Sequence, residues 1–261
     1  MSRLRVRFTK RGKIRFTSHR DVARMFERAF RRAEIPLAYT EGFSPRPRIS
    51  FGLALSTGYE SLAEYLDADL IDDVAGASGD EPGLPLRLSE ALPVGIDVVA
   101  VAPIDGHAPS LQQDVTSTTW RLTIIGADRE PVEAAAHEAM GAASIMATRT
   151  RKGQQSVDDL RPSLLALHLD PEVEPGDDVA FVAELATQPR ALRPAELIGA
   201  VWPTVDDVRA LRTHQWIERD GARWEPLPSD APETRFVRRE TPDVRTDPER
   251  RCRAPVAGTA Y

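Results

Sequence analysis

The residues best suited to chemistry in this sequence are arginines near the N-terminus, because a guanidinium group binds phosphate or carboxylate oxygens through a fixed fork of donors. Three of them alternate with apolar residues over residues 3–8, and a further row steps by four and then three residues from Arg20 to Arg31. We expect these groups to hold an anionic partner. The candidate anion-binding residues are Arg5, Arg7, Arg20, Arg24, Arg28, Arg46, Arg48 and Lys152.

The charge distribution supports this expectation. The whole chain has 261 residues and a formal net charge of -6, but residues 1–50 carry 14 Lys or Arg against 4 Asp or Glu. That segment is therefore at +10, and the remaining 211 residues are at -16. Such asymmetry favours an anionic partner for one face, although a solvated basic surface without a partner would show the same composition.

Other kinds of chemistry have little support. His19 stands at a predicted helix start beside Ser18 and Asp21, so it is the candidate for acid–base catalysis, with a structural histidine as the alternative. The five histidines have no ligand-pair spacing and the single cysteine is Cys252, so we predict no metal site and no cofactor on this chain. Neither a glycine-rich phosphate loop nor a Gly-x-Ser-x-Gly motif is present.

Strands and one helix must position these arginines. The alternation over residues 3–8 predicts a strand with one buried face, and residues 14–16 predict a short second strand. A helix is expected from about residue 19 to residue 33, capped by Thr17 or Ser18. Further strands are expected at 48–53 and 64–70. Asp67 and Asp69 would then face the same side as Arg3, Arg5 and Arg7, so cross-strand pairing is an equally good explanation of those arginines.

The wider pattern predicts an α+β fold with two ferredoxin-like α/β sandwich domains in tandem. The boundaries are 1–102 for a basic N-terminal domain, 103–116 for a linker and 117–227 for the second domain. Residues 228–261 are rich in Pro, Arg and acidic residues and are expected to be a disordered tail. No apolar run approaches the roughly 20 residues that span a bilayer, and no signal peptide begins the chain, which predicts a soluble cytoplasmic protein.

Several motifs resemble the radical-SAM-linked protein family. They include Leu4-Arg5-Val6-Arg7-Phe8, Ser18-His19 with Asp21, residues 39–51 (YTEGFSPRPRISF), Glu64-Tyr65-Leu66-Asp67, Arg149-Thr150-Arg151-Lys152-Gly153 and Val157-Asp158-Asp159-Leu160-Arg161-Pro162. The resemblance covers roughly residues 1–200 and is densest over residues 3–70. It implies a stand-alone accessory protein, because one cysteine cannot supply the three-cysteine motif that holds a radical SAM cluster.

The resemblance implies a separate radical SAM enzyme, often of the cobalamin-binding type, as partner. We therefore expect an accessory protein that binds a structured RNA or another polyanionic substrate through its basic N-terminal face. One alternative is a protein-interaction module whose basic face docks on an acidic patch of the radical SAM enzyme. Another is a metal-independent ribonuclease that uses His19.

Overall fold

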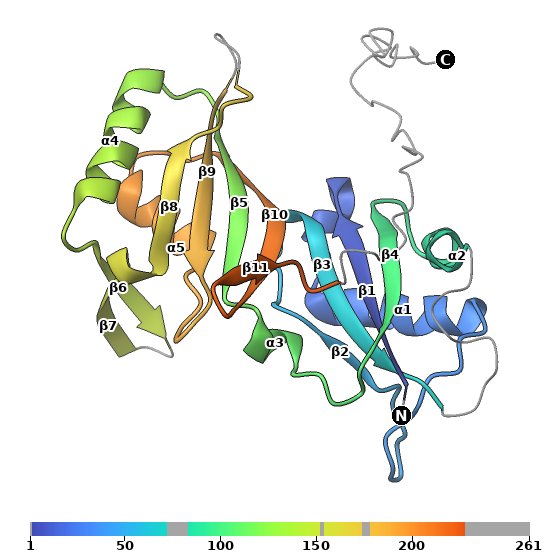
Figure 1. Ribbon diagram of the computed structural model, residues 1–261. Coiled ribbons are helices and arrows are strands. Elements are labelled where there is room, and N and C mark those ends of the chain that lie inside the picture. The colour runs from blue at the N-terminus through green and yellow to red at the C-terminus, as the bar shows by residue number, and fades with distance from the viewer. Residues whose placement is uncertain (1, 72–82, 152–153, 174–177, 228–261) are drawn as a thin grey trace, which may run out of the picture.

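The structure is a computed structural model that describes residues 2–71, 83–151, 154–173 and 178–227. It has a mixed α/β architecture in which the described residues form a large, mostly antiparallel sheet and five α-helices (Figure 1). Three expectations fall on residues outside these ranges: Lys152 as an anion ligand, Cys252, and the disordered tail at 228–261. No helix in the described part of the chain is long and apolar enough to cross a membrane.

The N-terminal half has a strand–helix–strand–strand–helix–strand order. Its elements are β1 (Arg3–Lys10), η1 (Gly12–Phe16), α1 (His19–Arg32), β2 (Ile49–Phe51), β3 (Glu60–Asp69), α2 (Leu84–Ala91) and β4 (Ile96–Ile104). The strands lie in the order β4-β1-β3, and β2 pairs with β3, all antiparallel. Leu4, Val6 and Phe8 of β1 pack with Phe26 and Phe30 of α1 in one buried cluster. This confirms the predicted buried face of the first strand.

The second half repeats this order, with a hairpin inserted after its first helix. Its elements are β5 (Ser117–Ile124), α4 (Arg129–Gly141), β6 (Met146–Arg151), β7 (Gln154–Asp159), η2 (Arg161–Ser163), β8 (Leu164–Leu169), β9 (Val179–Ala186), α5 (Pro194–Val201), β10 (Val208–Arg219) and β11 (Ala222–Trp224). The strands lie in the order β10-β5-β9-β8, whereas β6 and β7 form a separate two-stranded sheet. Short α3 (Leu111–Asp114) stands between the halves in the chain.

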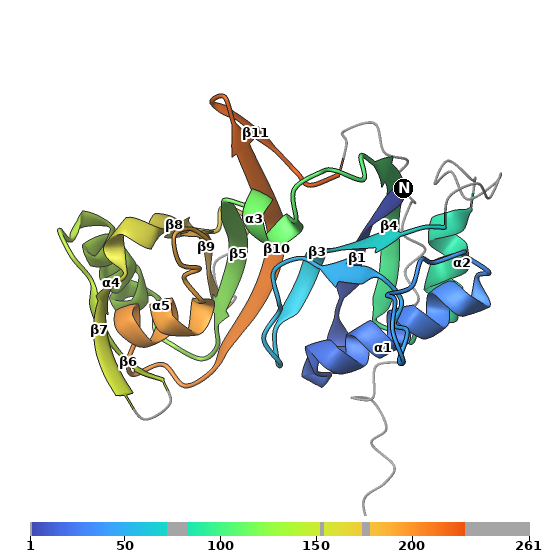
Figure 2. The same ribbon diagram turned by 90° about the horizontal axis from the view of Figure 1, so that it is seen from below.

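One continuous sheet joins the two halves. β3 and β10 pair in parallel through Leu211–Glu60 and Arg212–Ser61, and all the other strand pairs are antiparallel. The arrangement is visible in Figure 2, where β10 lies between β5 and β3. The strand over residues 208–219 was not predicted from the sequence. The middle of β10 reads Arg-Thr-His-Gln, which hides the alternation that predicts a strand.

One local expectation was wrong. Residues 14–16 are part of the 3₁₀ helix η1 and not a strand. Here Arg11 N–H donates to the Gly95 carbonyl at 2.8 Å, and Gly95 has φ 96°, with a Cβ there lying 2.4 Å from the Arg11 oxygen. Only glycine permits this close approach. The predicted linker 103–116 contains α3, whose Leu111 is 2% exposed.

A buried ion pair lies where the halves join. Arg212 is 2% exposed, and its Nε and Nη2 both donate to Glu64 Oε1, at 3.0 and 2.5 Å. Nη2 also donates to the Leu53 carbonyl at 2.9 Å, and the guanidinium carbon lies 5.3 Å from the Trp120 ring centroid. Removing one member of such a pair leaves the other charge buried without its partner.

We predict that Arg212→Ala lowers the free energy of unfolding by about 3–5 kcal/mol, measured by urea denaturation. Arg209→Ala is the matched control, because Arg209 lies on the same strand and is exposed. It should change stability by less than about 0.5 kcal/mol. Equal losses of unfolding free energy in the two variants would contradict a stabilising role for the buried Arg212–Glu64 pair.

Candidate anion-binding surface

The arginines of β1 face away from α1, as the alternation predicts, but they do not face water. Arg5 is 4% exposed and lies opposite Asp67 in the β1–β3 register. Its Nε donates to Asp67 Oδ1 at 2.7 Å and its Nη2 to Oδ2 at 2.9 Å, a bidentate pair. Its third nitrogen donates to the Pro226 carbonyl at 2.8 Å. All three nitrogens of the buried guanidinium donate within the protein, so Arg5 is not accessible to a phosphate.

The neighbouring arginines are also paired. Arg7 Nη1 donates to Glu225 Oε2 at 2.7 Å. Arg3 Nε donates to Asp69 Oδ1 at 2.7 Å, and Arg48 Nε lies 3.1 Å from Asp69 Oδ2. The expectation that this strand presents free guanidinium groups on an open sheet face was wrong. The cross-strand pairing that the sequence also allowed is what the structure contains.

The reason is that the second face of this half-sheet is covered. A small apolar cluster forms there from Ala63, Tyr65, Ala100, Ala102, Leu111 and Leu227. Residues 225–227, which come more than 200 positions after β1, supply the carboxylate for Arg7 and the carbonyl for Arg5. The face is closed, so Arg5 and Arg7 act as structural residues.

The arginines of α1, unlike those of β1, are exposed to solvent. Val22, Phe26, Ala29 and Phe30 are the buried residues of this helix. The opposite surface carries four exposed arginines, which we call the α1 basic surface: Arg20, Arg24, Arg28 and Arg31. Within the described residues, one ion pair to this surface is present, Arg24 to Asp21 at 3.5 Å, with both side chains about half exposed. This part of the predicted site is available to an anionic ligand.

Local structure holds the α1 basic surface in place. Ser18 caps the helix by accepting a hydrogen bond from Asp21 N–H at 3.2 Å, as the sequence predicted. Just before it lie η1, with exposed Lys13, and the preceding residue Arg11, which is also exposed. These two residues were not among the predicted ligands, although the sequence Lys-Arg-Gly-Lys at positions 10–13 was a visible signal.

The sheet separates the predicted site into two groups. Arg5 and Arg7 lie on one face of β1, whereas α1 packs on the other, so they do not join Arg20, Arg24 and Arg28 in one surface. Arg46 stands apart in the loop between α1 and β2, where it is exposed. Lys152 belongs to the residues that are not described.

His19 is the first residue of α1 and is exposed, with its ring 5.0 Å from that of Phe51. It lines a cavity of about 10 Å³ together with Lys10 and Glu64. That volume holds about one water molecule and not a nucleotide. Lys10 Nζ donates to the carbonyls of Thr17 and Arg15, at 2.9 and 3.3 Å. Burial lowers the pKa of Lys10, while the Glu64 carboxylate opposes this shift.

Among the described residues, no group of three or more His, Cys, Asp or Glu is placed to hold a metal ion.

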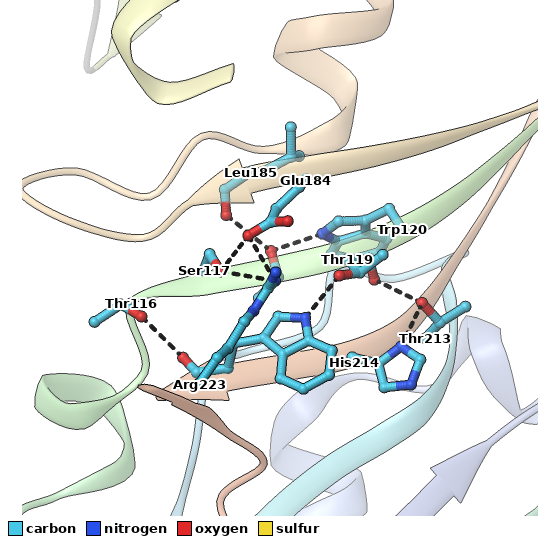
Figure 3. A network of polar contacts seen from close by, with 11 residues as sticks. Thr116, Ser117, Thr119, Trp120, Glu184, Leu185, Thr213, His214 and Arg223 are labelled. Carbon is cyan, nitrogen blue, oxygen red and sulfur yellow. Dashed lines mark hydrogen bonds and ion pairs between the residues drawn. The ribbon is translucent and has the colours of Figure 1, made fainter. Parts of the chain in front are cut away.

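A polar network at the centre of the sheet was not foreseen from the sequence. The rings of His214 and Trp216 stack at 4.9 Å with an angle of 11°, and the Arg223 guanidinium lies 4.2 Å from the Trp216 centroid. Figure 3 shows Arg223 reaching Glu184, to which it donates at 2.6 Å, while Ser117 donates to the same carboxylate at 2.8 Å. The network attaches the β10–β11 hairpin to β5 and β9.

This network makes stability depend on pH. Burial lowers the pKa of His214; the nearby Glu225 carboxylate opposes this shift, and the Arg7 and Arg223 cations reinforce it. The unfolded chain therefore takes up a proton near pH 6.5 that the folded protein does not, and stability falls as the pH drops through that range. We predict that His214→Gln weakens this fall in unfolding free energy between about pH 7.5 and pH 5.5. Parallel profiles for the two proteins would contradict the prediction.

Comparison with known proteins places these features in a bacterial family. Residues 3–194, well over half of the chain, match the family described as "Uncharacterized protein conserved in bacteria (DUF2344)". The matched range contains β1, the whole α1 basic surface and the loop that carries Arg46. Among curated proteins, none matches the chain. By its family match, the chain belongs to this uncharacterized bacterial family.

Proposed function

We propose that this protein is a cytoplasmic accessory protein that binds RNA, or another polyanion, through the α1 basic surface. The single observation that carries the proposal is the row of exposed arginines on α1, with Asp21 as its one ion-paired carboxylate in the described residues. A row of like charges on a helix costs free energy unless counterions or a ligand neutralise it. A nucleic-acid backbone supplies regularly spaced phosphates for that purpose.

The rest of the molecule supports such a partner. Excluding residues 1–50, the chain has a net charge of -16, which disfavours polyanion binding elsewhere. The arginines of β1 are neutralised by carboxylates. The unpaired basic groups of the N-terminal half are therefore concentrated on α1 and on the residues just before it. The ligand would therefore run along the outer side of α1 and not across the sheet.

The proposal includes a more specific description of the fold, namely two ferredoxin-like units in tandem. It is supported by the strand orders β4-β1-β3-β2 and β10-β5-β9-β8, in which each half places its strands in the order fourth, first, third, second. The β6–β7 hairpin is an insertion in the second unit. In this description α1 is the first helix of the first unit and carries the ligand on its outer side.

The proposed partner is a separate radical SAM enzyme, which the sequence resemblance implies. The chain itself contributes no cofactor in this proposal; it presents the polyanion to the partner. The main alternative uses the same surface differently, with the α1 arginines docking on an acidic patch of that enzyme. Co-purification that survives nuclease treatment and is lost in Arg24→Glu/Arg28→Glu would favour the alternative.

A second alternative is a ribonuclease that uses His19, and its test is direct. If His19→Ala leaves RNA turnover by the purified protein unchanged, this alternative is removed. The cavity beside His19 has room for about one water molecule and not for a nucleotide.

We predict that Arg24→Glu/Arg28→Glu weakens binding to single-stranded RNA at least about tenfold at low salt and flattens the dependence of log K on log salt by about 1.4, because each lost phosphate contact on a single strand contributes about 0.7. Fluorescence anisotropy over a salt series measures both quantities. The control variant, Arg193→Glu/Arg209→Glu, makes the same charge change at exposed positions in the second half.

The control should bind almost as tightly as the native protein, with a slightly weaker affinity from the change in net charge. Equal losses in the two double variants would show that net charge, and not the α1 basic surface, determines binding. Absence of any RNA binding by the native protein at low salt would contradict the proposed function itself.

A further inference from the structure

An exposed aromatic ring stands at the tip of the loop between α1 and β2. Phe43 has a relative exposure of 109%, the largest of any exposed apolar side chain in the described residues. The loop projects away from the body of the N-terminal half, below β2 in Figure 1. A phenylalanine with no contact on either ring face contributes nothing to the core, so the stability of the fold does not explain its position.

The loop is held rigidly at its base. Arg48 N–H donates to the Ala38 carbonyl at 2.8 Å and Thr40 N–H donates to the Arg46 carbonyl at 2.9 Å. Arg46 N–H in turn donates to Thr40 Oγ1 at 3.0 Å. Pro45 and Pro47 restrict the returning arm further. The ring is therefore presented at low entropic cost to a binding partner.

The surroundings of the ring favour a planar ligand with polar edges. Its neighbours in the sequence, Glu41, Gly42 and Ser44, are exposed and add no apolar side chain at the tip. The Arg46 side chain is exposed and makes no hydrogen bond or ion pair with any other described residue. An exposed aromatic ring and an exposed guanidinium on the same short loop are a combination that can stack one nucleobase and contact a nearby phosphate.

We infer that Phe43 stacks on an unpaired nucleobase and that Arg46 contacts an adjacent phosphate, so that the ligand is single-stranded RNA or a single-stranded loop. This inference rests on the proposed function, because the α1 basic surface supplies the remaining phosphate contacts. A base inside a duplex is stacked between its neighbours and cannot offer a face to the ring. The protein should therefore distinguish single strands from duplexes through this loop.

The experiment compares an oligouridine of about 12 nucleotides with a duplex of the same length, each titrated against the full-length protein. Phe43→Ala should weaken binding of the single strand about tenfold and leave duplex binding unchanged. The slope of log K against log salt should stay at the native value, because the ring contacts no phosphate. The Phe43 side chain is fully exposed, so Phe43→Ala should fold as the native protein does.

Two control variants separate stacking from simple hydrophobic contact. Phe43→Trp should retain or increase single-strand affinity, whereas Phe43→Leu should lose as much as Phe43→Ala, because leucine has no π face. If Phe43→Ala binds the single strand as tightly as the native protein, or Phe43→Leu retains full affinity, the inference is wrong while the α1 proposal stands. If charge reversal on α1 has no effect either, the proposed function fails as well.

Discussion

Arg5 and Asp67 face each other across β1 and β3, and this register determines where the protein's positive charge can act. The same pairing brings Arg3 to Asp69, and the chain segment after β11 brings Glu225 to Arg7. Each guanidinium on this face is neutralised by a carboxylate, which comes from β3 for Arg3 and Arg5 and from the second half of the chain for Arg7. A buried charge is tolerated only when it is paired and its donors are satisfied, so these arginines cannot be released to a ligand without a large cost.

The basic groups that remain free are those that the core cannot reach. Phe26 and Phe30 anchor α1 against the sheet, and Arg24 and Arg28 therefore point away from it. The segment just before α1 adds exposed Arg11 and Lys13 to the basic groups of the helix, whereas Arg46 stands apart in the loop after it. Burial and charge thus divide the arginines into a structural group and a group that faces solvent. The proposed function depends on the second group alone.

The division could be predicted from the sequence only in part. Alternation of Leu4, Val6 and Phe8 was enough to predict β1 and the face it buries, and Ser18 was enough to predict the start of α1. Closure of the other face could not be predicted in this way, because it depends on Leu227 and Pro226, which are distant in the sequence. β10 was missed because Arg212 and Gln215 are buried polar residues whose partners come from the other half.

The most direct test of this account is the reactivity of individual arginines with phenylglyoxal, followed by mass spectrometry with and without single-stranded RNA. We expect Arg20, Arg24 and Arg28 to react quickly in the free protein and to be protected by RNA. Arg5 and Arg212 should react only when the protein unfolds, because both side chains are buried and ion-paired. If Arg5 reacts as quickly as Arg28, or if bound RNA leaves Arg28 unprotected, the account is wrong.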